Sequence, residues 1–170
     1  LSVNVNKIAT LRNARGEDTP NLVQVVIDCE RFGADGITVH PRPDERHIKL
    51  NDMYDLSKVI TTEFNVEGYP NSRFMSLISD ILPSQVTLVP DLPNVLTSNS
   101  GWDTKVNQSL LTELNTELKL KGIRSSIFVD TNLQSIEYAA KSGADRVELY
   151  TGPYALNYSD NREGVIQDYI

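Results

Sequence analysis

The sequence has little of several features that mark particular classes of protein. It holds one cysteine in 170 residues, so no disulfide can form within the chain. No apolar run is long enough to cross a bilayer, and no leader sequence is recognisable at its first residues. The sequence therefore predicts a soluble domain without a membrane partner, and the cytoplasm as its compartment.

Positive charge is also scarce. The chain has 16 Lys and Arg against 23 Asp and Glu, which gives a formal net charge of −7 and a pI of about 4.8. Nucleic acid is excluded as the main partner, because phosphate backbones require a basic face. A small phosphorylated ligand needs only a few arginines or backbone amides. Cys29 lies among apolar residues of a predicted helix, which favours a buried structural thiol over a nucleophile.

The chain does contain a regular alternation of strand and helix patterns. Strands are predicted at residues 1–6, 36–40, 63–67, 85–89, 125–129 and 146–150. Amphipathic helices are predicted at 20–33, from Asn51 or Asp52 to 60, and at 71–81, 103–122 and 132–143. Such alternation predicts a parallel sheet with helices outside it. Similar glycine corners, Gly-Ala-Asp at 33–35 and at 143–145, lead from a helix into a strand.

Several finer predictions follow from the same patterns. Residues 7–19 are predicted as a loop, with Thr19 capping the first helix, and residues 151–170 as a loop that ends in a helix. In the predicted helix 103–122 the core-facing residues are expected at spacing four, at Val106, Leu110, Leu114 and Leu118. In the predicted helix 132–143 the inward residues are expected to be Ile136, Ala139 and Ala140.

Two folds are compatible with this alternation. A doubly wound open sheet needs no more than six strands, but both glycine-rich nucleotide fingerprints are missing. Polar residues instead follow one strand after another, as at the mouth of a (β/α)8 barrel. They are Asn4, Asn6, His40, Glu67 and Glu148. The sequence therefore predicts a single domain over 1–170: a (β/α)8 TIM barrel with about six of its eight βα units.

The segment 33–48 is the strongest functional candidate. It holds both histidines of the chain, His40 and His47, with Arg42 between them. A strand followed by a charged, proline-containing loop is typical of α/β active sites. Arg15 and Arg42 each follow a strand and are candidate phosphate ligands.

Two carboxylates are candidates for proton transfer. Glu67 ends an otherwise apolar strand, where a carboxylate can exchange protons near neutral pH. Alternation places Glu148 on the inner face of its strand, where a carboxylate is costly unless it is used or paired. His40, His47, Glu67 and Glu148 could also bind zinc or manganese, although no close ligand spacing supports a metal site.

Several motifs resemble the pyridoxine 5′-phosphate synthase family. They are NVNKIATLRNARG at 4–16, ADGITVH at 34–40 with Arg42 and RHI at 46–48, NVE at 65–67, LVP at 88–90 and VELYTG at 147–152. The resemblance covers the chain in order. It implies a (β/α)8 barrel that condenses 1-deoxy-D-xylulose 5-phosphate with 3-amino-2-oxopropyl phosphate, without metal or organic cofactor. The products are pyridoxine 5′-phosphate, inorganic phosphate and water.

The resemblance also implies roles for individual residues. His40 and Glu67 are expected to accept protons, and Glu148 to stabilise the transition state. Ligands for the deoxyxylulose phosphate are expected at Asn6, Lys7, Arg42, His47 and Thr97. Asn4 and Arg15 are expected to face the amino-ketone phosphate. The family often has Asp and His where this chain has Asn6 and Lys7, which changes the charge beside the sugar phosphate.

The family's late His-Gly motif, which holds its proton donor, is expected beyond Ile170. The 170 residues alone are therefore expected to be poorly stable and inactive. The resemblance further implies a homo-oligomer, commonly an octamer. Two alternatives remain: a metal-dependent sugar-phosphate isomerase or aldolase on the same barrel, and a truncated, non-catalytic relative that only binds.

Overall fold

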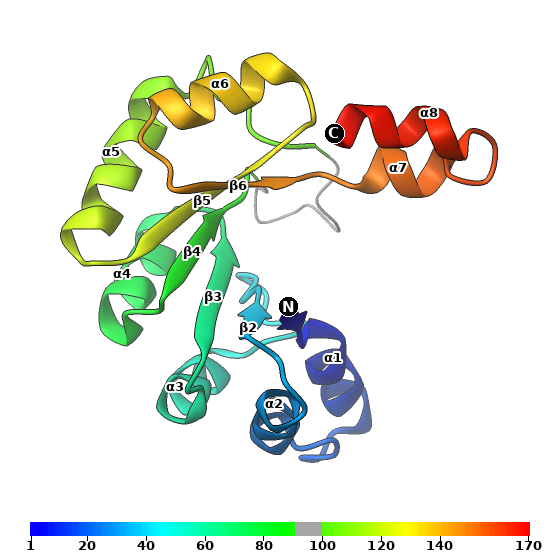
Figure 1. The fold of residues 1–170 in the computed structure, drawn as a ribbon. Helices are drawn as coiled ribbons and strands as arrows, with labels where there is room; N and C mark the ends of the chain where they lie inside the picture. Colours follow the sequence, from blue (N-terminus) through cyan, green and yellow to red (C-terminus); the bar gives the residue numbers. More distant parts are fainter. Residues whose placement is uncertain (91–99) are drawn as a thin grey trace.

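The computed structural model of the chain contains one parallel sheet and describes residues 1–90 and 100–170. The strands pair in sequence order, each with the next, so β1 and β6 form the two edges (Figure 1). The strands are β1 (Ser2–Asn4), β2 (Gly36–Val39), β3 (Glu63–Gly68), β4 (Gln85–Leu88), β5 (Arg124–Val129) and β6 (Arg146–Leu149). All six predicted strands are confirmed.

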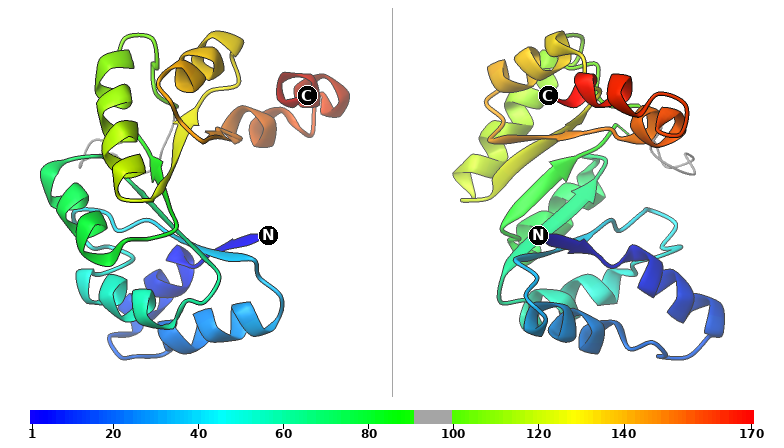
Figure 2. Two further views of the ribbon diagram at one scale, coloured as in Figure 1. Left: turned by 60° about the vertical axis from the view of Figure 1, so that its left-hand side comes forward. Right: turned by 45° about the vertical axis from the view of Figure 1, so that its right-hand side comes forward.

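The sheet curls, and its helices lie on the outer, convex side (Figures 1 and 2). This arrangement is an incomplete (β/α)8 barrel, which confirms the predicted fold class. The helices are α1 (Asn6–Arg15), α2 (Leu22–Arg31), α3 (Leu50–Val59), α4 (Ser72–Ile81), α5 (Gln108–Leu120), α6 (Leu133–Lys141), α7 (Gly152–Asn157) and α8 (Arg162–Ile166), followed by the 3-10 helix η1 (Gln167–Tyr169). In the described parts of the chain, no helix has the length and apolar character needed to cross a membrane.

Side chains alternate between the two faces of the sheet. On β2 and β3 the apolar core residues Ile37, Val39, Phe64 and Val66 pack with the helices, as do their counterparts on the later strands. Residues at the alternate positions, among them Thr38, Asn65 and Glu67, line the cavity on the inner side. The alternation therefore separates an apolar outer layer from a polar barrel interior.

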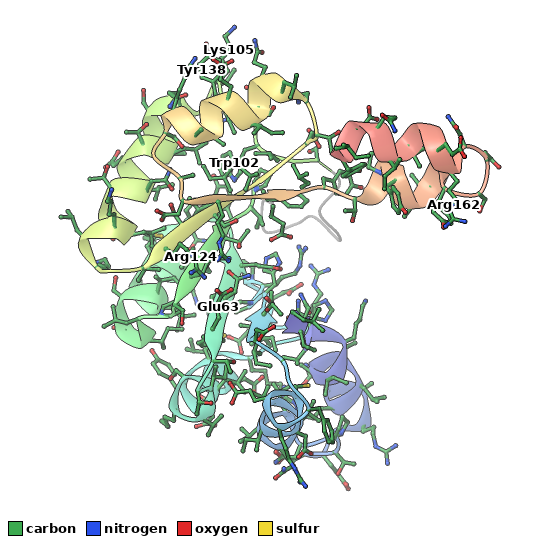
Figure 3. The ribbon with its side chains drawn as sticks, in the orientation of Figure 1. Glu63, Trp102, Lys105, Arg124, Tyr138 and Arg162 are labelled. Atoms are coloured by element: carbon green, nitrogen blue, oxygen red, sulfur yellow. The ribbon has the colours of Figure 1, made fainter. Side chains whose placement is uncertain are left out.

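Hydrogen bonds between strands hold the polar interior together. Asn65 donates to Thr38 Oγ1 at 3.3 Å and accepts from Gln85 at 3.1 Å and from Thr87 at 3.0 Å. At the start of β3, Glu63 pairs with Arg124 of β5 (Figure 3) and lies 3.5 Å from Arg146 of β6. Buried polar groups are tolerated here because they are paired.

The predicted loop at residues 7–19 is wrong, because most of it forms α1. This helix starts directly after β1 and ends at Gly16, whose φ of 76° is left-handed. Its buried positions include Ala9 and Arg12. A small residue and a charged residue at inward positions leave no apolar stripe, so the helical period is hidden in the sequence. An ion pair with Asp52 makes burial of Arg12 possible.

The N-terminal caps of three helices also differ from expectation. The first predicted helix is capped by Asn21, which accepts from the Gln24 amide, and not by Thr19. Helix α3 begins at Leu50, one or two residues before the expected cap, and Asp52 accepts from the Lys49 amide inside its first turn. Asp103 caps a turn ahead of α5 and not the helix itself, because it accepts from the Val106 amide while α5 starts at Gln108.

In α5 the core face consists of Leu111, Leu114, Asn115 and Leu118. Val106 is 78% exposed and Leu110 41% exposed. A row at spacing four drifts around a helix of 3.6 residues per turn, so the predicted stripe leaves the core towards its N-terminal end. In α6, Ala139 is buried as predicted and Ile136 packs on the core, but Ala140 is exposed.

Both predicted glycine corners are confirmed, since Gly33 and Gly143 have φ values of 98° and 84°. The sequence predicts that the chain after β6 starts as a loop and ends as a helix. In the structure a helix already begins at Gly152, and two short helices, α7 and α8, follow β6. Figure 1 shows this pair, in orange and red, projecting from the β6 edge of the sheet.

Candidate active site

A histidine and a carboxylate meet at the carboxyl ends of β2 and β3. His40 Nδ1 lies 3.7 Å from Glu67 Oε2, and both side chains are largely buried, at 10% and 15% exposure. The parallel register pairs Val39 with Val66, so the residues that follow each of them are neighbours at the same edge. The sheet therefore places these two predicted proton acceptors side by side.

The start of α1 holds His40 in place. Asn6 Oδ1 accepts the His40 backbone N–H at 2.9 Å, and the Asn6 backbone N–H donates to Asn4 Oδ1 at 3.0 Å. Asn4 ends β1 and lines the inner cavity together with Glu67. Three neighbouring strands thus contribute predicted site residues to one region.

Glu148 joins this region from the other edge of the sheet. It lies on β6 and lines the same inner cavity as Asn4 and Glu67. Burial raises the pKa of its carboxyl above the ordinary value of 4.5. Glu148 therefore points to the inner face of the sheet, as strand alternation predicts.

Replacing Glu148 with glutamine is expected to change how stability depends on pH. A carboxyl whose pKa is higher in the folded state binds more protons there, so its contribution to stability falls as pH rises above about 4.5. Glutamine cannot ionise, so the variant is expected to gain stability relative to the parent chain over that range. Denaturant unfolding at a series of pH values measures this difference.

The control for this experiment is Glu137→Gln. The exposed Glu137 pairs with Lys141 at 2.7 Å, which lowers the pKa of its carboxyl, so its pH dependence has the opposite sign. Equal pH profiles for Glu148→Gln and the parent chain would show that burial of Glu148 does not penalise its charge.

His47 lies in the loop after β2, surrounded by positive charge. Burial lowers the pKa of its imidazole below the ordinary value of 6.5, and Lys7, Arg46 and Arg42 lower it further. The ring is therefore neutral at pH 7. Arg42 is 9% exposed. Arg46 pairs with Asp44 at 2.7 Å, whereas Lys7 and Arg42 beside the neutral histidine are suited to a phosphate ester.

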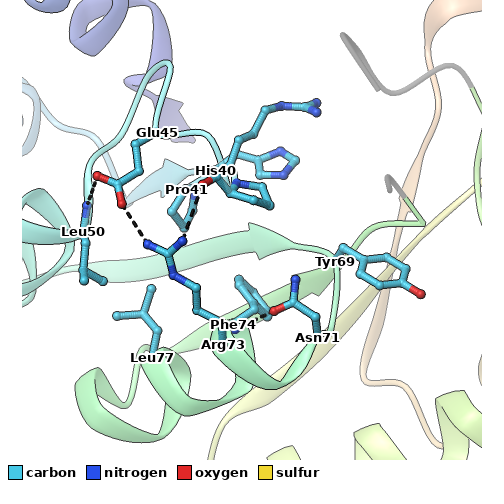
Figure 4. Close-up of a pocket in the computed structure, with 11 residues that line it drawn as sticks. His40, Pro41, Glu45, Leu50, Tyr69, Asn71, Arg73, Phe74 and Leu77 are labelled. Carbon is cyan, nitrogen blue, oxygen red and sulfur yellow. Dashed lines mark hydrogen bonds and ion pairs between the residues drawn. The ribbon is translucent and has the colours of Figure 1, made fainter. Parts of the chain in front are cut away.

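A second cavity lies on the other side of His40, between the loop after β2 and α4 (Figure 4). Arg73 of α4 reaches across it to Glu45 at 2.8 Å and to the Pro43 carbonyl at 3.5 Å. Glu45 also accepts from the Leu50 amide at 3.4 Å. These contacts tie the loop that carries Arg42 to the helix after β3.

The structure does not place Arg15 at the inner cavity. Arg15 is the exposed last residue of α1, and nine residues of helix separate it from Asn6 by about 14 Å along the axis. It does not line the inner cavity. Thr97 lies outside the described residues. Lys7 is exposed, in the first turn of α1.

Sequence reasoning missed the residues that support His47. Asn13 donates to the His47 carbonyl at 2.8 Å, and Thr10 Oγ1 lies 2.7 Å from His47 Nδ1. Thr10 and Asn13 lie three residues apart on α1 and therefore share a face of that helix, which the expectation of a loop concealed. Arg12, on the same helix, forms two hydrogen bonds with Asp52, at 2.6 and 2.8 Å.

The segment after the undescribed residues is fixed by the ends of β4 and β5. Trp102 Nε1 donates to the Leu88 carbonyl at 3.0 Å, and the Gly101 amide donates to Asp130 at 3.0 Å. A Cβ at Gly101 would lie 2.3 Å from backbone atoms of Val129, so only glycine fits there. No sequence pattern marked this contact.

The predicted zinc or manganese ligands do not come together as a set. Within residues 1–90 and 100–170, no group of three or more His, Cys, Asp or Glu side chains is arranged to hold a metal ion. Cys29 is half-buried and packs against the core, which agrees with the expected structural thiol.

Comparison with known proteins identifies close relatives. The chain is 60% identical over its full length to the pyridoxine 5′-phosphate synthase of Cytophaga hutchinsonii, and 61% identical to that of Phocaeicola vulgatus. In each case it spans 71% of the relative. A third enzyme of this name, from Bacteroides thetaiotaomicron, is 59% identical.

Solved structures resemble the chain in fold alone. A mandelate oxidase superposes with a TM-score of 0.62 at 12% identity, over 89% of this chain and 51% of the oxidase. A flavocytochrome b2 superposes with a TM-score of 0.60 at 16% identity, over 99% of this chain and 46% of the cytochrome. The model of the family described as pyridoxal phosphate biosynthesis protein PdxJ matches residues 1–169. With relatives this similar along its whole length, the chain belongs to the PdxJ family.

Proposed function

We propose that the chain carries the active site of a pyridoxine 5′-phosphate synthase. It condenses 1-deoxy-D-xylulose 5-phosphate with 3-amino-2-oxopropyl phosphate to give pyridoxine 5′-phosphate, inorganic phosphate and water. The observation that carries this proposal is the His40–Glu67 pair, 3.7 Å apart at the carboxyl edge of the sheet, in a chain about 60% identical to enzymes of this name.

The proton transfers are assigned to this pair. Imine formation, loss of phosphate, enolisation and ring closure each move a proton, and none of them needs a redox group. His40 and Glu67 accept protons. Glu148, facing the same cavity, stabilises the transition state, because a carboxylate in a buried site interacts strongly with developing positive charge. No organic cofactor or metal enters the proposed reaction.

The two phosphate esters have separate ligands in this proposal. Arg42, His47, Asn6 and Lys7 hold the deoxyxylulose phosphate, with Thr97 as a further ligand. Asn6 and Lys7 begin α1, and the positive end of a helix favours a phosphate group. The electrostatic influence of Lys7 and Arg42 on His47 supports their placement around one ligand. Asn4, which lines the inner cavity, faces the amino-ketone phosphate, whereas Arg15 at the far end of α1 is left out of the proposed site.

The wider setting follows from the resemblance. The proposal includes a single barrel domain over 1–170, a homo-oligomeric assembly of the octameric type, and the cytoplasm as the compartment. The chain spans 71% of the first two relatives, so the proposal is tested in a protein of their full length.

The test joins residues 1–170 to the C-terminal region of the Cytophaga hutchinsonii relative; we call this protein the completed chain. Phosphate release with both substrates together, and none with either alone, is the expected result. A rate that a chelator abolishes and added zinc or manganese restores would favour the metal-dependent alternative. Tight binding of either phosphate ester without turnover would favour the non-catalytic one.

A further inference from the structure

The Thr10 hydroxyl makes two close contacts. Its Oγ1 lies 3.0 Å from the Asn6 carbonyl oxygen and 2.7 Å from His47 Nδ1. Two hydrogen bonds require two hydrogen atoms, and a threonine hydroxyl supplies one. The Asn6 carbonyl supplies none, so the second hydrogen must come from His47 Nδ1. In this arrangement Thr10 donates to Asn6 and accepts from the imidazole.

The opposite arrangement leaves an oxygen pair unsatisfied. If Thr10 donated to His47 Nδ1, its Oγ1 would face the Asn6 carbonyl at 3.0 Å with no hydrogen between two acceptors. Part-buried acceptors that face each other in this way are unfavourable. The backbone of His47 is also held in place, because Asn13 donates to its carbonyl at 2.8 Å.

We propose that Thr10 is a positioning residue that fixes His47 as the Nδ1–H tautomer. In a neutral imidazole with Nδ1 protonated, Nε2 is a hydrogen-bond acceptor. Burial and the nearby cations Lys7, Arg46 and Arg42 lower the pKa of the imidazole and so favour its neutral form, in which the contact with Thr10 selects the tautomer.

The tautomer determines which part of a ligand His47 can contact, and this step rests on the proposed function. A fully ionised phosphate offers only acceptors, so it cannot bond to an unprotonated Nε2. A sugar hydroxyl can donate to it. His47 therefore binds a hydroxyl group of the sugar phosphate, and the phosphate itself goes to Arg42 and Lys7.

Nitrogen-15 NMR of histidine-labelled protein tests the tautomer without reference to activity. The chain has two histidines, and His47→Gln identifies the signals of His47. The expected spectrum at pH 7.5 shows a protonated Nδ1 and an unprotonated Nε2. A protonated Nε2 in the parent chain would overturn the proposal, whether or not any variant folds.

Three variants show whether Thr10 is responsible. Thr10→Val is expected to shift the tautomer ratio roughly fivefold towards Nε2–H, the effect of one lost hydrogen bond, and Thr10→Ser to preserve it. Thr112→Val is the matched control, because Thr112 donates to the carbonyl four residues earlier on α5 and contacts no histidine in the described structure. An unchanged ratio in Thr10→Val would overturn the role of Thr10.

Kinetics of the completed chain test the ligand assignment. Thr10→Val is expected to raise KM for the sugar phosphate roughly fivefold, with the KM for the amino ketone unchanged and serine restoring the parent value. An unchanged KM beside the expected NMR result would overturn the hydroxyl contact alone. Absence of turnover in the parent completed chain would count against the proposed function and leave the tautomer result standing.

Discussion

Glu67→Gln in the completed chain is expected to lower the rate of pyridoxine 5′-phosphate formation by about 10²- to 10⁴-fold, the usual contribution of a positioned general base. Glutamine keeps the shape of the side chain but cannot accept a proton at this position. It also removes the carboxyl group 3.7 Å from His40 Nδ1, so an imidazolium formed when His40 accepts a proton loses its stabilising partner. Single-turnover kinetics followed across pH measure both effects.

Glu63→Gln is the matched control for this experiment. Glu63 lies four residues earlier on the same strand and faces the same interior, but it pairs with Arg124, away from His40. The control is expected to lower the unfolding temperature while the turnover rate stays near that of the parent. If Glu67→Gln retained a rate within threefold of the parent, the assignment of Glu67 as a proton acceptor would be wrong.

Asp52→Ala is expected to destabilise the chain by about 3 kcal/mol, because it leaves the Arg12 guanidinium buried without its partner. The two side chains are 9% and 14% exposed, and their closest atoms lie 2.6 Å apart. For a domain of this size, a loss of that magnitude lowers Tm by roughly 6–12 °C. Calorimetry or circular dichroism of the completed chain measures it.

The comparison variant is Asp55→Ala on the same helix. Asp55 pairs with Lys58 at 3.2 Å, with both side chains more than half exposed, so its loss is expected to cost less than about 1 kcal/mol. Replacing both Arg12 and Asp52 with leucine is expected to cost less than Asp52→Ala alone, because no unpaired charge remains. Equal costs for Asp52→Ala and Asp55→Ala would show that burial does not strengthen the Arg12–Asp52 interaction.

Much of the framework could be predicted from local patterns. The strands are short apolar segments between glycine, proline and polar turns, and each has one face against the helices, so the period of two is visible. The same period correctly placed Glu148 on the inner face, opposite Leu149, which packs on the core. Polar residues at the ends of successive strands, together with the missing nucleotide-binding loops, were enough to favour a barrel over an open sheet.

Helix α1 shows where local patterns fail. Its inward positions are occupied by Ala9 and Arg12, and the second of these is stable there only because Asp52 arrives from α3, forty residues later. No window of sequence around Arg12 contains that information. In α5 the four-residue spacing of leucines was a misleading signal, because the helix turns every 3.6 residues and its buried face instead includes Leu111 and Asn115.

The sequence by itself determined the order of the strands, the alternation of side chains along them and the types of side chain at their ends, because these depend on neighbours along the chain. Only the tertiary structure decided which of those side chains meet. Parallel register brought His40 to Glu67, and α1 brought Thr10 to His47. The tertiary structure also left Arg15 at the far end of α1, because the distance between residues in space is set by packing and not by their separation in sequence.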